Sequence, residues 1–174
     1  MLNGAKGRIS YKAFCKYYHE AREQFKKKRN QYLIDSIQAI YAGIEDEILT
    51  GKTKLNLNKV VEMINYLASK VSSLHKVKLM KMLWYSDCLH YKRYGTAISG
   101  LAYSALPYKF KSTPGFEIKE LTQPEIQTLD YIISKLWDLP KYEIVDKMYN
   151  EEAYRSTASF CIIPFYIAEL LAID

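Results

Sequence analysis

Lys-Val-Lys-Leu-Met-Lys-Met-Leu-Trp-Tyr-Ser-Asp-Cys-Leu-His-Tyr-Lys-Arg-Tyr, residues 76–94, is the stretch that decides the fold. Its apolar side chains fall on adjoining turns of a helix, and Gly95 follows where a left-handed C-terminal cap is needed. It is the most apolar helical segment in the chain. We therefore expect it to be the central helix, with Leu79, Leu83 and Trp84 buried.

Helical periodicity also extends to both sides of this segment. Helices are expected over residues 10–49, as two helices or one long bent one, and from Asn56 or Asn58 to about residue 72. Thr122 and Glu125 form a capping-box pattern that opens a helix through Trp137. Pro140 and Pro164 are each placed to begin a further helix.

Between these helices the periodicity changes. Residues 98–108 and 116–121 alternate in the manner of strands, and a basic connection containing Pro and Gly separates them. The predicted fold class is therefore mainly α: a compact helical domain around a central helix at about 76–94, with a small antiparallel β element at about 98–108 and 116–121.

Composition narrows the class of protein. Of the 174 residues, 49% are apolar and 25% charged, which excludes a wholly disordered chain. No run of eighteen apolar residues is present, so no membrane partner is expected, and no hydrophobic stretch precedes Lys6 and Arg8 as it would in a signal peptide. These features predict a cytoplasmic protein.

Metal, cofactor and common enzyme motifs are not recognisable. The chain has three cysteines, Cys15, Cys88 and Cys161, which is an odd number without C-x-x-C spacing and so argues against disulfides and a zinc ribbon. Cys88 and His90 are two residues apart, on different helix faces, so they are not placed to bind one zinc ion. Glycine-rich nucleotide loops and the usual hydrolase motifs are absent as well. We expect neither a metal nor a cofactor.

Asp87 and His90 are the one pair that suggests reaction chemistry. They lie three residues apart and so project from the same face of the central helix. They could act as an acid–base pair, but the sequence offers no third group that would complete a catalytic site. A hydrogen bond between them that anchors the helix is the favoured alternative.

Charge is divided along the chain. Residues 1–114 carry 20 Lys and Arg against 8 Asp and Glu, whereas residues 115–174 carry 5 against 11. The basic part, including Lys26 to Arg29, could bind nucleic acid, or it could pair with the acidic part of the same chain. The second interpretation is favoured.

Residues 76–108 carry an ordered family pattern. Lys78-Leu79, Leu83-Trp84-Tyr85-Ser86-Asp87 and Leu89-His90-Tyr91 are followed by Tyr94-Gly95, Ile98-Ser99-Gly100, Tyr103 and Pro107-Tyr108. This order strongly resembles the Panacea family, also called SocA-like antitoxin domains. The motif residues shared with the family are Lys78, Leu79, Leu83, Tyr85, Asp87, His90, Gly95, Gly100 and Pro107.

The resemblance implies a domain division and one departure from the family. Residues 55–174 correspond to the antitoxin domain, and residues 1–54 form an N-terminal helical arm. After Tyr108 the chain lacks an internal segment of a few dozen family positions. No zinc-binding or helix-turn-helix region comparable to those of some relatives precedes Ser10, which argues against a role as autorepressor.

The resemblance also implies a function. It predicts a non-enzymatic antitoxin that neutralises a cognate protein toxin by direct binding in a bacterial or phage toxin–antitoxin system, alone or as a homo-oligomer or higher-order complex. A nucleic-acid-binding regulator is the first alternative, and an enzyme that reverses a toxin's modification with Asp87 and His90 is the second.

Sixteen tyrosines point to aromatic contacts with a partner, because Tyr and Arg are enriched at binding hot spots. The arm is the expected place for partner-specific contacts, since specificity needs features that differ between relatives. The predicted toxin-binding residues are Tyr17, Tyr18, Arg22, Tyr94, Tyr103 and Tyr108.

Overall fold

The computed structural model describes residues 47–103, 117–158 and 161–173, together with residues 16, 19–20, 23–24, 27–28, 31–32, 35 and 41. The chain divides into two units, Met1–Gly43 and Ile44–Asp174. In the first unit the described residues are all helical, as predicted, and all but one are exposed, whereas residues 47–54, which the sequence placed in the helical arm, form turns and a loop in the second unit. The elements described below belong to the second unit.

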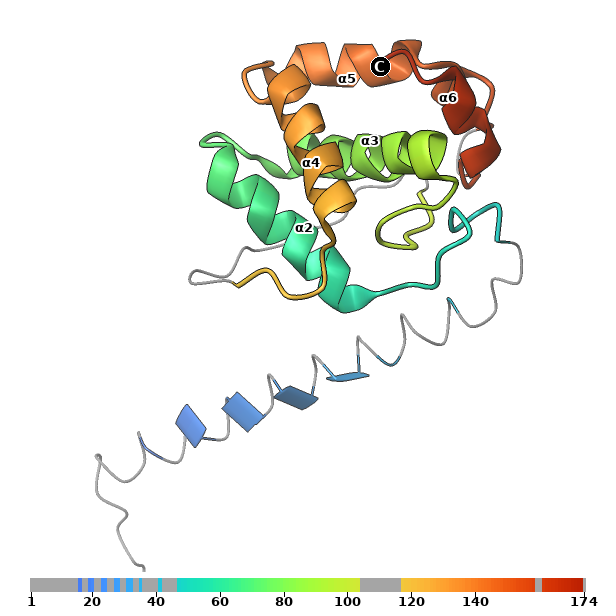
Figure 1. The fold of residues 1–174 in the computed structure, drawn as a ribbon. Coiled ribbons are helices and arrows are strands. Elements are labelled where there is room, and N and C mark those ends of the chain that lie inside the picture. Colours follow the sequence, from blue (N-terminus) through green and yellow to red (C-terminus); the bar gives the residue numbers. More distant parts are fainter. Residues whose placement is uncertain are drawn as a thin grey trace, which may run out of the picture. The chain divides into compact units, whose positions relative to one another are not determined.

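The second unit is built from helices. In order these are α2 (Leu57–Lys70), α3 (Lys76–Tyr94), α4 (Gln123–Leu136), α5 (Lys141–Asn150), the short α6 (Glu152–Arg155) and the 3₁₀ helix η1 (Phe165–Leu170). Figure 1 shows α3 running through the unit, and it contacts α2, α4, α5 and η1. The predicted central helix is confirmed.

Local sequence signals explain where these helices begin and end. The Asn56 side chain accepts a hydrogen bond from the Lys59 amide and so caps α2. Thr122 and Glu125 form the predicted capping box of α4. Gly95 ends α3 in the left-handed conformation, with φ at 78°.

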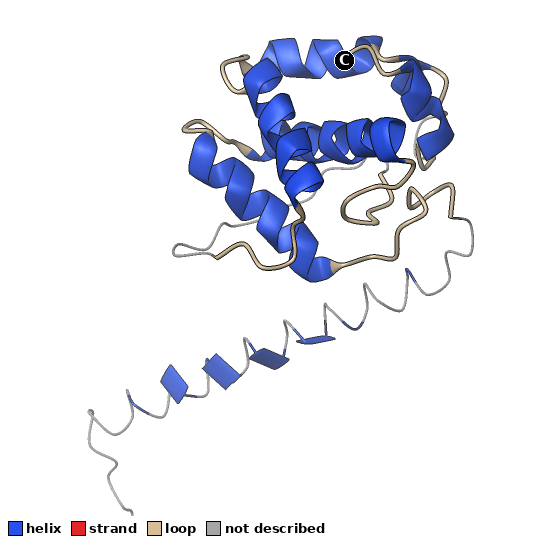
Figure 2. Ribbon diagram, viewed as in Figure 1, coloured by secondary structure: helices blue, strands red, loops and turns tan. Residues whose placement is uncertain are grey.

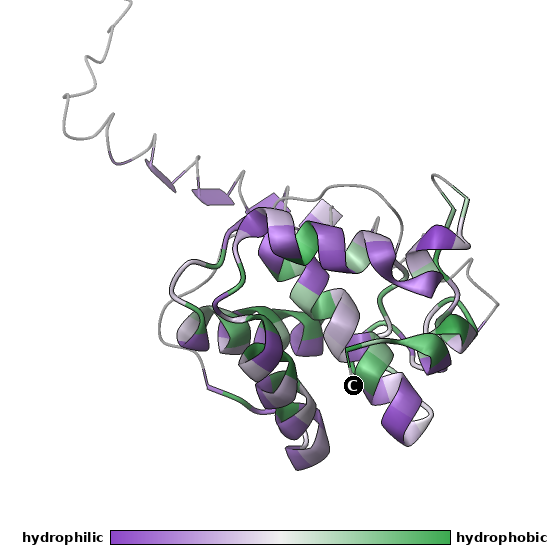
Figure 3. Ribbon diagram, turned by 90° about the horizontal axis from the view of Figure 1, so that it is seen from above, coloured by the Kyte–Doolittle hydropathy of each residue, from purple (hydrophilic) through white to green (hydrophobic). Residues whose placement is uncertain are grey.

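α3 is buried around most of its circumference. Every residue from Met82 to His90 is buried, and Leu79, Leu83 and Trp84 are among the core residues, as predicted. The other helices bury one stripe each, for example Leu129, Ile132 and Leu136 of α4. Figure 3 shows the resulting mixture of hydrophobic and hydrophilic residues along the outer helices.

The predicted β element is wrong for the residues that the structure describes. Residues 98–103 and 117–121 form loops, drawn in tan in Figure 2. One reason is that two buried carboxylates accept several of their backbone N–H groups: Asp87 accepts from Ile98 and Ser99, and Glu62 accepts from residues 119–121. Those N–H groups are therefore not available to a neighbouring strand. The remaining positions of the prediction, 104–116, lie outside the described residues.

Membrane insertion was not expected from the sequence. In the part of the chain that the structure describes, no helix has the length and apolar character needed to cross a bilayer.

Candidate functional site

One residue of the family motif, Asp87, orders the loop that follows α3. Asp87 lies fully buried on α3 and accepts hydrogen bonds from the Ile98 and Ser99 amides at 2.8 and 2.9 Å. Its second oxygen accepts from the Ser99 hydroxyl and from the Tyr103 hydroxyl at 2.6 Å. One carboxylate thus holds both ends of the segment from Ile98 to Tyr103.

Burial dominates the electrostatics at this carboxylate. It raises the pKa of Asp87, and the hydrogen bonds from Ser99, Tyr103 and Ile98 act in the opposite direction. Burial also raises the pKa of Tyr103 well above its usual value, and the nearby Asp87 adds to this effect. Tyr103 therefore stays protonated and donates to Asp87.

A second segment packs against the same loop. The Ala97 amide donates to the Gly51 carbonyl at 2.8 Å, the Asn56 amide donates to the Ser99 carbonyl at 3.0 Å, and the Thr53 hydroxyl donates to the Ala97 carbonyl at 2.8 Å. The Ile163 amide also donates to the Tyr103 carbonyl at 2.9 Å. The loop after α3 is consequently fixed on several sides.

His90 contacts a different group from Asp87. Its Nδ1 atom lies 3.1 Å from the Thr128 hydroxyl of α4, and its ring packs on Tyr94 with 4.5 Å between the centroids. Asp87 and His90 therefore form neither the predicted acid–base pair nor the predicted hydrogen bond. Each of them contacts a different part of the fold. Asp87 orders a loop, and His90 joins α3 to α4.

The environment of His90 predicts a pH effect on stability. Burial lowers the pKa of His90, the carboxylate of Glu125 opposes this shift and Lys59 adds to it. The unfolded chain then takes up the proton first, so stability should fall as the pH drops below about 6.5. Urea denaturation at pH 7.5 and 5.5 should show this loss.

Two variants separate the effect of His90 from that of His19. His90→Gln should flatten the pH dependence, whereas His19→Gln should keep it because His19 is exposed in the first unit. The salt bridge between Lys59 and Glu125, 2.6 Å long, acts in another pH range. Burial would raise the pKa of Glu125, but hydrogen bonds from Lys59 and Thr122 lower it overall, so its contribution is lost only in stronger acid. If the free energy of unfolding of wild type and of His90→Gln changes equally between pH 7.5 and 5.5, the assignment to His90 is refuted.

Lys78 and Tyr85 complete the motif inside the protein. The buried Lys78 ammonium donates to the carbonyls of Trp137 and Leu139 at 2.5 and 3.0 Å, where the negative end of α4 favours a cation. Burial lowers its pKa. Tyr85 donates to the buried Glu151 at 3.0 Å, and the other oxygen of Glu151 accepts from the Ala172 amide at 2.9 Å.

Removing the Tyr85 hydroxyl tests this connection. Tyr85→Phe should lower the free energy of unfolding by about 1 to 2 kcal/mol, because one oxygen of the buried Glu151 loses its donor. Urea denaturation would measure the change. Tyr166→Phe, at an exposed tyrosine, is the matched control and should leave stability unchanged; a Tyr85→Phe variant as stable as this control would argue against the hydrogen bond.

The predicted toxin-binding residues separate into three groups. Tyr94 is exposed at the end of α3, with 51% of its surface accessible. Tyr103 is buried and bound to Asp87, which withdraws its side chain from any partner in this conformation. Tyr17, Tyr18, Arg22 and Tyr108, and the motif residue Pro107, lie outside the described residues.

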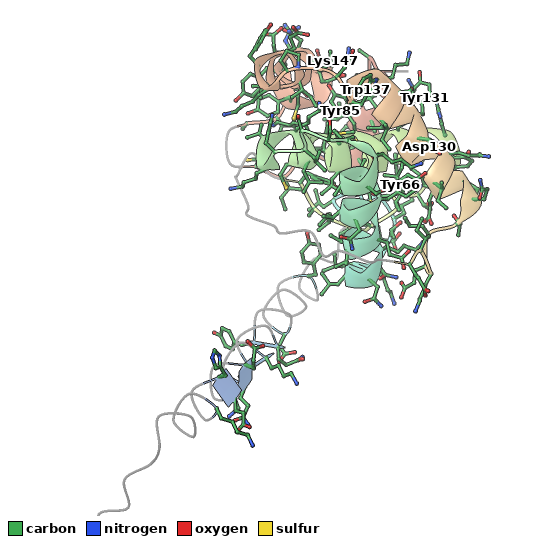
Figure 4. The ribbon with its side chains drawn as sticks, turned by 90° about the vertical axis from the view of Figure 1, so that its left-hand side faces the viewer. Tyr66, Tyr85, Asp130, Tyr131, Trp137 and Lys147 are labelled. Carbon is green, nitrogen blue, oxygen red and sulfur yellow. The ribbon has the colours of Figure 1, made fainter. Side chains whose placement is uncertain are left out.

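Sequence reasoning missed several residues that matter to the structure. Glu62 and Glu151 are buried carboxylates that hold distant loops, and acidic side chains in helical sequence are usually solvent-exposed. Tyr66 and Asp130, labelled in Figure 4, join α2 to α4 through a 2.7 Å hydrogen bond. Burial and Asp130 together raise the pKa of Tyr66 to about 12.

The described residues contain no group of three or more His, Cys, Asp or Glu side chains that could hold a metal ion. Cys88 is buried and free, and burial raises its pKa well above the usual value, which keeps the thiol protonated.

Comparison with known proteins gives one result for this chain. Residues 79–108 match the family model described as antitoxin SocA-like, Panacea domain. The resemblance seen in the sequence is therefore confirmed for the segment that includes α3 from Leu79 onward and the loop that Asp87 orders. Neither the curated proteins nor the solved structures contain a match.

Proposed function

From the SocA-like Panacea segment at residues 79–108, we propose that the chain is an antitoxin that neutralises a cognate protein toxin by direct, non-covalent binding in the cytoplasm. The proposal rests on where the motif side chains lie. Lys78, Tyr85 and Asp87 are buried and bonded to other parts of the same chain. The motif side chains therefore stabilise the fold, and we assign toxin binding to the surface of the domain.

The enzymatic alternative has less support from the geometry. Asp87 is surrounded by four donors from residues 98–103, and His90 is directed at Thr128. Proton transfer to a substrate would need at least one of these groups to face a site where the substrate can bind. Their present contacts instead connect elements of the fold.

The nucleic-acid alternative has less support from the charge of the described body. From Glu47 onward the described residues include 14 Lys and Arg against 13 Asp and Glu. The formal net charge of this part is therefore only +1, which is too small for the extended positive field that draws in nucleic acid. Direct binding of a protein remains the better-supported function.

Co-expression tests the proposal. The protein encoded by the adjacent gene should stop growth when expressed alone, and co-expression of this chain should restore growth. The two proteins should also co-purify, and light scattering would then give the stoichiometry, including any homo-oligomer. A His90→Gln variant that folds should still protect, because binding needs no acid–base chemistry.

Three results would contradict the proposal. If no adjacent gene product is toxic and rescued by this chain, the antitoxin assignment fails. If a folded His90→Gln variant loses protection while still binding the toxin, the enzymatic alternative replaces direct neutralisation. Strong, salt-sensitive binding to a DNA or RNA duplex without toxin binding would favour the regulator instead.

A further inference from the structure

α5 carries two large, exposed aromatic residues away from its buried stripe. Its buried stripe consists of Ile144 and Met148, and these two residues join it to the core. Tyr142 and Tyr149 lie seven residues apart on another face and are 71% and 49% exposed. Exposed aromatic side chains that share one helix face are typical of binding surfaces.

Part of this aromatic face is ordered before any partner arrives. The rings of Tyr149 and Tyr154 pack together with 4.7 Å between their centroids. The Lys81 ammonium of α3 lies 5.8 Å from the Tyr149 centroid and 5.6 Å from the Tyr154 centroid. Because these two rings are already held in place, they lose little conformational entropy on binding.

A groove lies along the other flank of α5, beside the C-terminal segment. It has a volume of about 440 Å³, and its walls come from Leu139, Glu143, Asp146, Lys147, Asn150, Glu151 and Ala172. Hydrogen bonds hold the groove in place. The buried Glu151 accepts from the Ala172 amide on one wall and from the Tyr85 hydroxyl of α3. Figure 1 shows the C-terminal end beside α5, and Figure 4 labels Lys147.

The charge around α5 determines which partner fits. The exposed residues of 137–152 include four Asp and Glu against two Lys, and one of these, Lys147, lines the groove with Glu143 and Asp146. Glu151 is occupied inside the protein, but Glu143 and Asp146 are exposed and line the groove. Carboxylates beside exposed aromatic rings complement Lys and Arg side chains, whose stems pack on the rings while their charged heads reach the acids.

We propose that α5 is the helix to which the cognate toxin docks, and that the toxin contacts it through a basic segment. Lys or Arg side chains of that segment enter the groove at Glu143 and Asp146, and its remaining residues pack on Tyr142 and Tyr149. This inference rests on the proposed function. It places the toxin contact on the C-terminal half of the chain, in addition to or in place of the N-terminal arm.

Binding of the purified adjacent-gene toxin to the full chain tests the inference. Calorimetry should give at least a tenfold loss of affinity for Tyr142→Ala and for the charge reversal Asp146→Lys, because hot-spot aromatics and paired charges dominate such interfaces. The loss for Asp146→Lys should shrink as salt is raised. Tyr142 and Asp146 are both exposed, so unchanged circular dichroism and melting temperature are expected for the variants.

Matched controls use exposed residues on other elements. Tyr166→Ala on η1 and Glu117→Lys should bind the toxin as tightly as wild type. Wild-type affinity in both α5 variants, or a loss confined to Tyr94→Ala, would overturn the docking site while leaving the antitoxin function intact. A loss of self-association with unchanged toxin affinity in Tyr142→Ala would also overturn it, since α5 would then bind a second copy. If wild type itself does not bind the toxin, the proposed function has failed instead.

Discussion

Asp87→Ala is expected to lower the free energy of unfolding by about 4 kcal/mol or more, which approaches the lower end, about 5 kcal/mol, of the whole stability of a folded domain. The change removes the acceptor of four hydrogen bonds at a fully buried position. Two backbone amides and two hydroxyls would be left with unmet hydrogen-bonding capacity, at about 1 to 3 kcal/mol for each buried group that finds no other partner. Urea denaturation followed by circular dichroism would measure the loss.

Two further variants show whether the carboxylate itself is responsible. Asp87→Asn keeps the shape and one acceptor oxygen, so it should recover part of the stability. Asp130→Ala removes an exposed carboxylate that accepts one hydrogen bond from Tyr66, and should cost less than about 1 kcal/mol. In the Asp87 variants, hydrogen exchange should increase most in the loop from Ile98 to Tyr103, beyond the general increase that lower global stability brings to the core amides. An Asp87→Ala protein as stable as the Asp130→Ala control would refute the role.

The helices could be predicted because their signals are local. The apolar positions of α3 recur within one segment, and its end at Gly95 depends on the next residue alone. The cap at Asn56 and the box at Thr122 and Glu125 likewise join residues three apart. Such patterns stay readable whatever the rest of the chain does.

The loops could not be predicted because their partners are distant in sequence. Alternation at residues 116–121 suggested a strand, yet Glu62 of α2 binds the amides at 119–121 from 57 to 59 positions away. Nothing in the pattern around Glu62 distinguishes it from an exposed helix residue. The same holds for Glu151, which joins Tyr85 to Ala172.

The site was predictable in its motif but not in the role of each residue. The motif marks Asp87 in the sequence. Its hydrogen bonds from Ser99 and Tyr103 could not be predicted, because they depend on how the loop returns to α3. Tyr103 and Tyr94 look alike as surface anchors in the sequence, but one is buried and the other exposed. Tyr142 and Tyr149 do carry a sequence signal, since neither belongs to the apolar stripe of Ile144 and Met148.

Gly100→Ala should produce the other large effect, a loss of about 3 to 5 kcal/mol that combines backbone strain with a steric clash. Gly100 has a φ of 72°, which disfavours any residue with a Cβ atom. A Cβ atom there would lie 2.6 Å from the carbonyl carbon and oxygen of Lys54 and from the Thr53 carbonyl oxygen. These are backbone atoms, and the Asn56–Ser99 hydrogen bond holds this segment against the loop, so relief requires moving the two segments apart.

Gly95→Ala is the matched control, because the two glycines share the left-handed conformation and differ in their surroundings. Gly95 has a φ of 78°, and a Cβ atom added there would meet nothing within 4 Å. Its loss should be limited to the conformational term, about 1 kcal/mol, in the same urea experiment. The difference between the two variants therefore measures the close approach of Gly100 to residues 53 and 54. If the two alanine variants unfold at the same urea concentration, the segments are free to separate, and the packing described for this loop is wrong.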